Sequence, residues 1–385
     1  MSAPIRITVP TIEEDDLAAV REVLESGFLV QGPRVEAFEA AVAAEAGTAH
    51  AVAVANGTAA LHLALVALDV RPGDLVVTTA YSWPATANVV ELCGATPVFV
   101  DIEPDTFNLD PDALDATLRR LFAVDAVGRR VRAVLPVHAF GQMADIERIG
   151  ALCAAYDLPL VEDAACALGA SWAGRPAGGA GTMGCFSFHP RKAVTTGEGG
   201  VVTTDDGALA SRLRALRNHG QERGADGHVR FTMAGFNYRL TEVQGALGVT
   251  QMAKLDRIVE ARRAGAARYD SLFAGGPVQP PAVPAPSHHV YQSYVVLLPD
   301  DVAPHRDGVL AALREAGIEA TVGTWHMPLI DVYRTRYGFA PGDFPAADAV
   351  FRRAVTLPLH AAIAPSEQER VAEALLTAVS APAVS

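Results

Sequence analysis

The chain has 385 residues, half of them hydrophobic and 19% charged, and its formal net charge is −13. This composition excludes a disordered chain, and the acidic balance argues against nucleic acid as the main partner, because that binding depends on clustered basic residues. The sequence has no run of the ~20 apolar residues that would span a membrane. Its first residues also lack the apolar core of a secretion signal. We therefore expect a cytoplasmic protein with no membrane partner.

The first half of the chain predicts alternating helices and strands. A helix capped by Thr11 and Glu14 is expected to end near Gly27, and a second helix follows Gly32-Pro33. Short apolar runs then predict strands at 50–55, 75–79, 97–102, 133–137, 158–161, 185–188 and 200–204, with helices at 57–68, 85–92, 111–121 and 145–156. Because the runs are continuously apolar and separated by helical segments, we expect a mostly parallel α/β sheet buried on both faces.

The second half predicts a smaller unit. A helical pattern covers 241–272, a proline-rich connector covers 277–286, and a strand at 291–298 and a helix at 307–316 follow. We predict a large domain over residues 1–255, which includes the N-terminal helix, and a small C-terminal α+β domain over residues 256–385.

Lysine is the rarest basic residue of this chain. Only Lys192 and Lys254 occur among 31 basic residues. Lys192 stands in a loop between two predicted strands, before a glycine-rich turn, where partial burial would make its amine a good nucleophile. Lys254 falls beside polar neighbours of a helical pattern, so we predict that it is solvated.

Two segments could hold an anionic or aromatic ligand. Gly57 and Thr58 stand where a strand passes into a helix, a place that binds phosphate or is simply capped, and the plain cap is the simpler interpretation of this segment alone. Asp163 follows a buried strand, so it either pairs with a protonated ring nitrogen or caps the next helix, and the sequence favours neither. Ser187 alternates with two phenylalanines and points away from them.

Other residues carry weaker signals. Trp83 could stack on a flat ring or could be a core residue, and His138 and His326 are candidate substrate contacts that could equally be buried structural histidines. Residues 179–184 match the GxGxxG pattern, but a loop precedes them and a strand follows, which argues against a dinucleotide site. The four cysteines have no zinc spacing, so we predict free thiols and no metal site.

Taken together, these segments resemble the DegT/DnrJ/EryC1/StrS family of fold-type I, pyridoxal-phosphate-dependent nucleotide-sugar aminotransferases. The resemblance runs from Gly27–Arg34 to Leu357–His360. It is densest at residues 56–58, 161–163, 186–200 and 235–240.

The resemblance implies roles for several of these residues and for one more, Asn237. Lys192 would form the internal aldimine with pyridoxal 5'-phosphate and later move protons, with pyridoxamine phosphate arising during turnover. Asp163 would pair with the ring nitrogen, Trp83 would stack on the ring, and Gly57, Thr58 and Ser187 would hold the phosphate. Asn237 would reach the phosphate from the partner subunit of a homodimer with shared active sites.

The resemblance also implies the reaction. An amino group would pass, most simply from L-glutamate, to a nucleotide-linked keto sugar. The segment 186–200 is most similar to enzymes that aminate C4 of 4-keto-6-deoxy sugars, although amination at C3 or of a cyclitol stays open. Cys166 departs from the family, which often has glutamine there.

Two more distant alternatives remain at this stage. One is an NAD-dependent oxidoreductase, which would rest on the GxGxxG match. The other is a regulatory protein that binds pyridoxal phosphate without turnover, against which the presence of both Lys192 and Asp163 argues.

Overall fold

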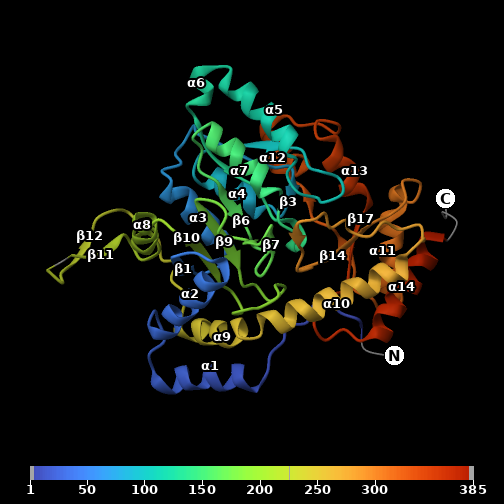
Figure 1. The fold of residues 1–385 in the computed structure, drawn as a ribbon, viewed down its shortest axis with the longest axis horizontal. Helices are drawn as coiled ribbons and strands as arrows, with labels where there is room; N and C mark the ends of the chain where they lie inside the picture. The colour runs from blue at the N-terminus through green and yellow to red at the C-terminus, as the bar shows by residue number, and fades with distance from the viewer. Residues whose placement is uncertain (1–3, 225, 381–385) are drawn as a thin grey trace.

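The computed structural model describes residues 4–224 and 226–380, and its centre is a mostly parallel sheet (Figure 1). One ladder has the order β1-β10-β9-β6 and the other β4-β2-β5. Parallel bridges from Val134 to Leu160 and from Val137 to Asp163 join β5 to β6, so the two ladders form one continuous sheet. The strands are β1 (His50–Val54), β2 (Leu75–Thr79), β4 (Thr96–Val100), β5 (Val131–Leu135), β6 (Val161–Asp163), β9 (Met183–Ser187) and β10 (Gly200–Thr204).

The direction of β10 is the exception in this sheet. It is antiparallel to both of its neighbours, β1 and β9, whereas the other pairings are parallel. The loop between β9 and β10 contains no helix, so β10 returns directly alongside β9. Lys192 lies in this return loop.

Helices cover both faces of the sheet, as continuously apolar strands require. Alternate residues of β1 show the two sides, since Ala51 and Ala53 belong to one apolar core and Val52 and Val54 to the other. The first core includes α2 (Pro33–Ala46), α5 (Pro111–Phe122) and α7 (Ile146–Ala155), and the second includes α3 (Gly57–Ala67), α4 (Ala85–Leu92) and α8 (Gly207–Arg217).

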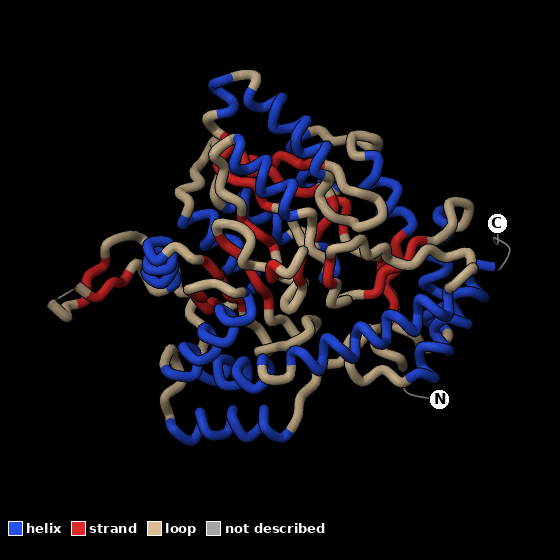
Figure 2. Tube along the Cα trace, in the orientation of Figure 1, coloured by secondary structure: helices blue, strands red, loops and turns tan. Residues whose placement is uncertain are grey.

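A second, smaller sheet lies beside the first (Figure 2). Its order is β14-β17-β15, with all pairs antiparallel. Its core also contains α11, α14 and the second half of α10. The elements are α10 (Leu255–Phe273), β14 (Tyr294–Leu297), α11 (Arg306–Glu315), β15 (Thr321–Val322), β17 (Ala354–Leu357) and α14 (Pro365–Ser380).

The long helix α10 connects the two units. Leu255 and Val259 pack in the core of the large sheet, whereas Tyr269 and Phe273 pack in the core of the small one. The domain division at residues 255 and 256 stays a prediction, because one helix contributes to both cores.

The remaining elements are short connections. They are α6 (Asp125–Gly128), α12 (Asp331–Tyr337), α13 (Pro345–Arg353), β3 (Tyr81–Ser82), β7 (Ser171–Trp172), β8 (Arg175–Pro176), β11 (Gln221–Arg223), β12 (Val229–Phe231), β13 (Ser287–His288), β16 (Trp325–His326) and three single turns of 3₁₀-helix, Ala139–Gly141, Ala303–His305 and Met327–Leu329. The β11–β12 pair projects from the edge of the molecule (Figure 1). The pairing of β16 with β3 joins the two units.

The N-terminal helix corrects two predictions. Helix α1 (Glu14–Ser26) is capped by Glu13 and Asp16 rather than by Thr11 and Glu14, because the Asp16 carboxylate accepts a bond from the Glu13 amide. It packs against α9 (Glu242–Met252). The predicted single helix over 241–272 is two helices, since α9 ends at Met252 and α10 begins at Leu255. The first three residues, on which the secretion-signal argument rested, lie outside the described residues.

Candidate active site

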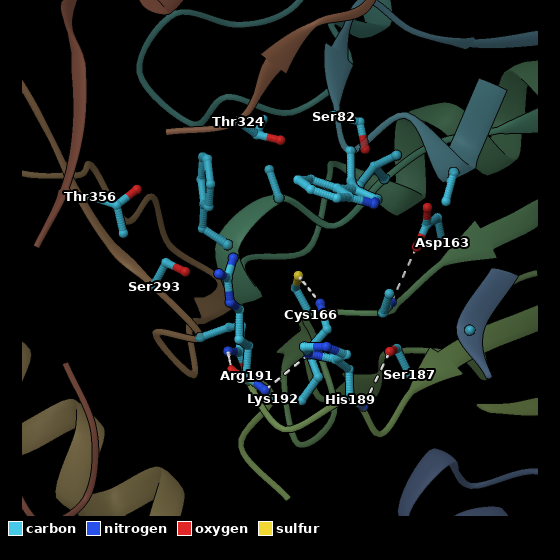
Figure 3. A pocket seen from close by; sticks show the side chains of 18 of the residues that line it. Ser82, Asp163, Cys166, Ser187, His189, Arg191, Lys192, Ser293, Thr324 and Thr356 are labelled. Atoms are coloured by element: carbon cyan, nitrogen blue, oxygen red, sulfur yellow. Dashed lines mark hydrogen bonds between the residues drawn. The ribbon is translucent and has the colours of Figure 1, made fainter. Parts of the chain in front are cut away.

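A cavity of about 830 Å³ lies between the large sheet and the smaller unit (Figure 3). Parts of the chain far apart in the sequence line it: the turn into α3, the start of α4, the end of β6, the loop after β9, and strands β15 and β17. Ligands of open α/β sheets bind beyond the carboxyl ends of parallel strands. The ends of β6 and β9 place Asp163 and Ser187 at this edge.

Asp163 is the buried carboxylate of the cavity, with 5% of its surface exposed. Its Oδ2 accepts a bond from the Thr86 hydroxyl at 2.8 Å and its Oδ1 accepts one from the Ala165 amide at 3.2 Å. Burial raises the pKa of Asp163, and these two bonds together with nearby Lys192 offset the effect only in part. The carboxylate is therefore under-compensated, and it would be stabilised by a cation or a charged N–H donor from a ligand.

The start of α3 faces the same cavity. Asn56 caps this helix by accepting a bond from the Ala59 amide, and Gly57 and Thr58 both line the cavity. A Cβ on Gly57 would lie 2.8 Å from the Cβ of Ser187, so only glycine allows the helix to begin against β9. The helix N-terminus and the Ser187 hydroxyl form a cradle suited to a phosphate group.

Lys192 reaches the cavity from the β9–β10 loop. Its Nζ lies 3.0 Å from the Sγ of Cys166, and both side chains line the cavity. Among the residues that the structure describes, no carboxylate forms an ion pair with Lys192. The amine therefore faces the cavity beside a weakly bonding thiol, at the position where the family often has glutamine.

Three other predicted site residues lie outside this cavity lining. His138 is fully buried, with its Nε2 bonded to Glu162 at 2.9 Å and its Nδ1 accepting from the Ala144 amide, so both ring nitrogens are engaged within the fold. His326 is buried with its Nδ1 3.9 Å from Asp348. Asn237 is exposed, and its backbone forms an isolated β-bridge with Asn218. Its contact across a subunit interface stays a prediction. Trp83, in contrast, does line the cavity, with 62% of its surface exposed.

The glycine-rich segment 179–184 has a structural role. The buried Glu162 carboxylate accepts bonds from the amides of Gly178, Ala180 and Gly181 at 2.7–2.9 Å. Strand β9 begins at Met183, two residues earlier than predicted, so the last two residues of the segment already belong to the strand. Its amides bind a carboxylate of the chain itself, so this loop offers no cradle for a dinucleotide.

Lys254 contradicts its prediction. It is buried, with 7% of its surface exposed, and its Nζ lies 2.7 Å from Asp15 and 2.6 Å from Asp16. The prediction was wrong because it treated residues 241–272 as one helix. The break before Leu255 turns the lysine toward α1.

Thr86 and Arg191 line the cavity but were not predicted from the sequence. Thr86 lies in the first turn of α4 and bonds Asp163, 77 positions away along the chain. Arg191 precedes Lys192 and lines the cavity. Only the β3–α4 turn, with its Trp-Pro pair, gave a signal near Thr86, and only the neighbouring lysine pointed to Arg191.

The cavity residues fit pyridoxal phosphate. A buried carboxylate that lacks a cation suits a protonated ring nitrogen, the start of α3 with Ser187 suits a phosphate, and Lys192 supplies an amine in the same cavity. Among residues 4–224 and 226–380 no cluster of histidine, cysteine, aspartate or glutamate could hold a metal ion. Within the same ranges, every helix is too short or too polar to cross a bilayer.

Comparisons with known proteins agree with this geometry. Residues 10–376 match the DegT/DnrJ/EryC1/StrS aminotransferase family. Helicobacter pylori PseC, an aminotransferase involved in the biosynthesis of pseudoaminic acid, is 28% identical with a TM-score of 0.90 over 98% of this chain and 99% of its own.

Two further structures are similar. The putative sugar aminotransferase Spr1654 from Streptococcus pneumoniae, in its PLP-form, is 28% identical with a TM-score of 0.89 over 98% of both chains. DesI, solved in the presence of its TDP-sugar product, is 31% identical with a TM-score of 0.87 over 98% of this chain and 94% of its own. The chain therefore has the fold-type I architecture and belongs to the DegT/DnrJ/EryC1/StrS family of pyridoxal-phosphate-dependent sugar aminotransferases.

Proposed function

We propose that this aminotransferase passes an amino group from L-glutamate to a nucleotide-linked keto sugar, at C4 of a 4-keto-6-deoxy sugar. The observation that carries the proposal is the meeting of three groups at one cavity: the Lys192 amine, the buried Asp163 carboxylate and the phosphate cradle at the start of α3. A cytoplasmic location remains the expectation from sequence.

In this proposal the residues of the large sheet hold the cofactor. Bound pyridoxal phosphate supplies the electron sink for carbanion chemistry. Asp163 holds the ring nitrogen in its protonated state, and Thr86 fixes the orientation of that carboxylate. Gly57, Thr58 and Ser187 bind the phosphate, and Trp83 covers the ring.

Lys192 carries the proton transfers. Its amine is free of ion pairs with described residues and faces the cavity, so it can accept a proton from one carbon and return it to another. One base can therefore serve both the donor and the acceptor half of the reaction.

The opposite wall of the cavity favours a sugar as the acceptor. It carries neutral hydroxyl groups from the smaller unit, namely those of Ser293, Thr324 and Thr356 (Figure 3). Thr321 also lines the cavity. Hydroxyl groups both donate and accept hydrogen bonds, which suits the hydroxyls of a sugar ring. Arg191 is the exposed cation of this cavity, and it can bind the carboxylate of glutamate or the diphosphate of a sugar nucleotide.

Two similarities support the finer assignments. The segment 186–200 is similar to enzymes that aminate C4, and the related DesI was solved with a TDP-sugar product. We also propose a homodimer with shared sites, in which Asn237 reaches the phosphate held by the partner.

The acceptor is tested by screening nucleotide-linked keto sugars. Protein loaded with pyridoxal phosphate is first mixed with L-glutamate, and formation of 2-oxoglutarate reports the donor half-reaction. Each keto sugar is then added, and NMR locates the new amine. Amination at C3, or of a cyclitol only, would refute the C4 assignment, and absence of 2-oxoglutarate would refute glutamate as donor.

The shared site is tested by mixing inactive variants. Asn237→Ala and Lys192→Ala damage different parts of one site, so a hybrid dimer would contain one intact site. We expect partial recovery of activity after subunit exchange. Exchange without recovery would argue against sharing.

A further inference from the structure

The second lysine is buried among acidic side chains of the N-terminal helix. Nζ of Lys254 lies 2.7 Å from Asp15, 2.6 Å from Asp16 and 3.5 Å from Glu13. Asp16 is 1% exposed, so its carboxylate depends on this cation. A compact ammonium can contact three carboxylates of one helical turn, which the planar head of arginine does less well. This explains why lysine stands here in a chain that otherwise prefers arginine.

Asp16, held by Lys254, also contacts the side-chain amide of Gln251 and so orients it. The Gln251 Nε2 donates to both oxygens of Asp16 at 3.2 Å and to the Thr11 carbonyl at 2.7 Å. Because these acceptors hold the Gln251 nitrogen, the amide oxygen of Gln251 points away from Asp16 and Thr11. Gln251 is 1% exposed, so water does not compete for either end.

The Gln251 oxygen then contacts the loop that carries Lys192. It accepts a bond from the Thr195 amide at 3.3 Å. The Thr195 hydroxyl in turn donates to the Phe188 carbonyl at 2.8 Å and accepts from the Gly197 amide at 3.0 Å. Thr195 therefore closes the loop 188–197 on itself, and Lys192 lies within that loop.

We propose that Lys254 is a positioning residue, which fixes the backbone around Lys192 through Asp16, Gln251 and Thr195. This inference rests on the proposed role of Lys192 for its functional meaning. The two lysines then act together: the ion-paired Lys254 holds the loop in place, and Lys192 within that loop reacts.

The test measures hydrogen exchange at the Thr195 amide in the cofactor-free protein. Lys254→Met keeps the length of the side chain and removes its charge, and Gln251→Leu removes the acceptor but leaves the ion pair. We expect either change to speed exchange in residues 193–198 at least about tenfold, while the amides of β10 keep their rates within about threefold.

Arg257→Met is the matched control. Arg257 of α10 pairs with the exposed Glu13 at the N-cap of α1 and forms no hydrogen bond with Gln251. It should leave Thr195 exchange within about twofold. In the loaded enzyme, the two test variants should lower kcat more than they raise KM, because the loop orients a reacting group rather than binding substrate.

Two outcomes would overturn the proposal. One is unchanged Thr195 exchange in Gln251→Leu. This variant keeps the ion pair of Lys254, so it tests the contact between Gln251 and Thr195 even when Lys254→Met does not fold. The other is equal acceleration throughout the protein, which marks general destabilisation. Failure of the proposed function is seen separately, as a cofactor adduct on a residue other than Lys192, and leaves the exchange result interpretable.

Discussion

Lys192 and Lys254 show two opposite uses of the same side chain. Lys254 is surrounded by three carboxylates of α1, whereas Lys192 has a thiol 3.0 Å away and a large cavity in front of it. Burial alone would lower the pKa of Lys254, but its bonds to Asp15 and Asp16 outweigh that effect and raise the pKa. Ion pairing therefore keeps the Lys254 amine protonated, whereas the Lys192 amine has no such partner among the described residues and faces the cavity.

An aspartate beside each lysine shows the same contrast: Asp16 pairs with Lys254, and Asp163 lies near Lys192. Burial would raise the pKa of Asp16, but the bonds from Lys254, Thr250, Glu13 and Gln251 hold the pKa below its ordinary value. Burial does raise the pKa of Asp163, whose partners are fewer. Asp16 is satisfied within the chain, whereas Asp163 needs a cationic partner from outside it.

The largest expected effect comes from removing the reactive lysine. Lys192→Ala should lower turnover at least about 10³-fold, because it removes both the covalent attachment and the acid–base group. Borohydride reduction of the loaded native protein, followed by mass spectrometry, should find the pyridoxyl group on Lys192 alone. A reduced adduct on Lys254 would contradict the assignment of Lys192 as the reactive amine.

The second prediction concerns Asp163→Asn. Turnover should fall by about 10²-fold or more, since an amide supplies no negative charge for the ring nitrogen. Because the pKa of Asp163 is raised in the folded state, its contribution to stability is present at low pH and is lost as the pH rises through the folded-state pKa. The cofactor-free variant should therefore unfold at a higher temperature than the native protein at neutral pH, as measured by calorimetry. Near-native turnover would show that Asp163 does not hold the ring nitrogen.

The third prediction concerns Lys254→Met. It should lower the free energy of unfolding by about 3 kcal/mol, at the low end for a broken buried ion pair because Asp15 is half exposed. The folded-state pKa of Asp16 is lowered, so its stabilisation is present above pH ~4 and is lost as the pH falls through the folded-state pKa. Urea unfolding at pH 7 and at pH 3 should therefore differ less in the variant than in the native protein. An equal pH dependence would mean that Lys254 does not hold Asp16 ionised.

The smallest effect is expected at the thiol beside the reactive lysine. Cys166→Ser should change turnover by less than about threefold, because a weak hydrogen-bonding group is replaced by another small one. Steady-state rates with glutamate and a keto sugar measure this effect. A loss of more than tenfold would show that Cys166 takes part in the chemistry, and that Lys192 depends on its neighbour as Lys254 does.

The sequence predicted the local features of the fold well. The strands at 75–79 and 200–204 and the helix at 85–92 begin and end where the apolar pattern placed them. The two strands are rich in valine and threonine, and turn residues adjoin each of them at one end. The helix follows Pro84 and ends just before Gly94, so the local pattern was enough. The break at Ala253-Lys254 was missed because both flanking segments have helical periodicity, and only packing against α1 distinguishes them.

The family, the mostly parallel sheet and the residues that face the cavity from strand ends were all readable in the sequence, because they follow from residue type and the local hydrophobic pattern. Tertiary structure alone decided how polar groups are partnered. In the fold, His138 is buried against Glu162, the glycine-rich loop binds that carboxylate, and Lys254 is buried. Each of these pairings joins residues distant in the chain, and the cost of leaving a buried polar group unpaired selects partners that no local pattern reveals.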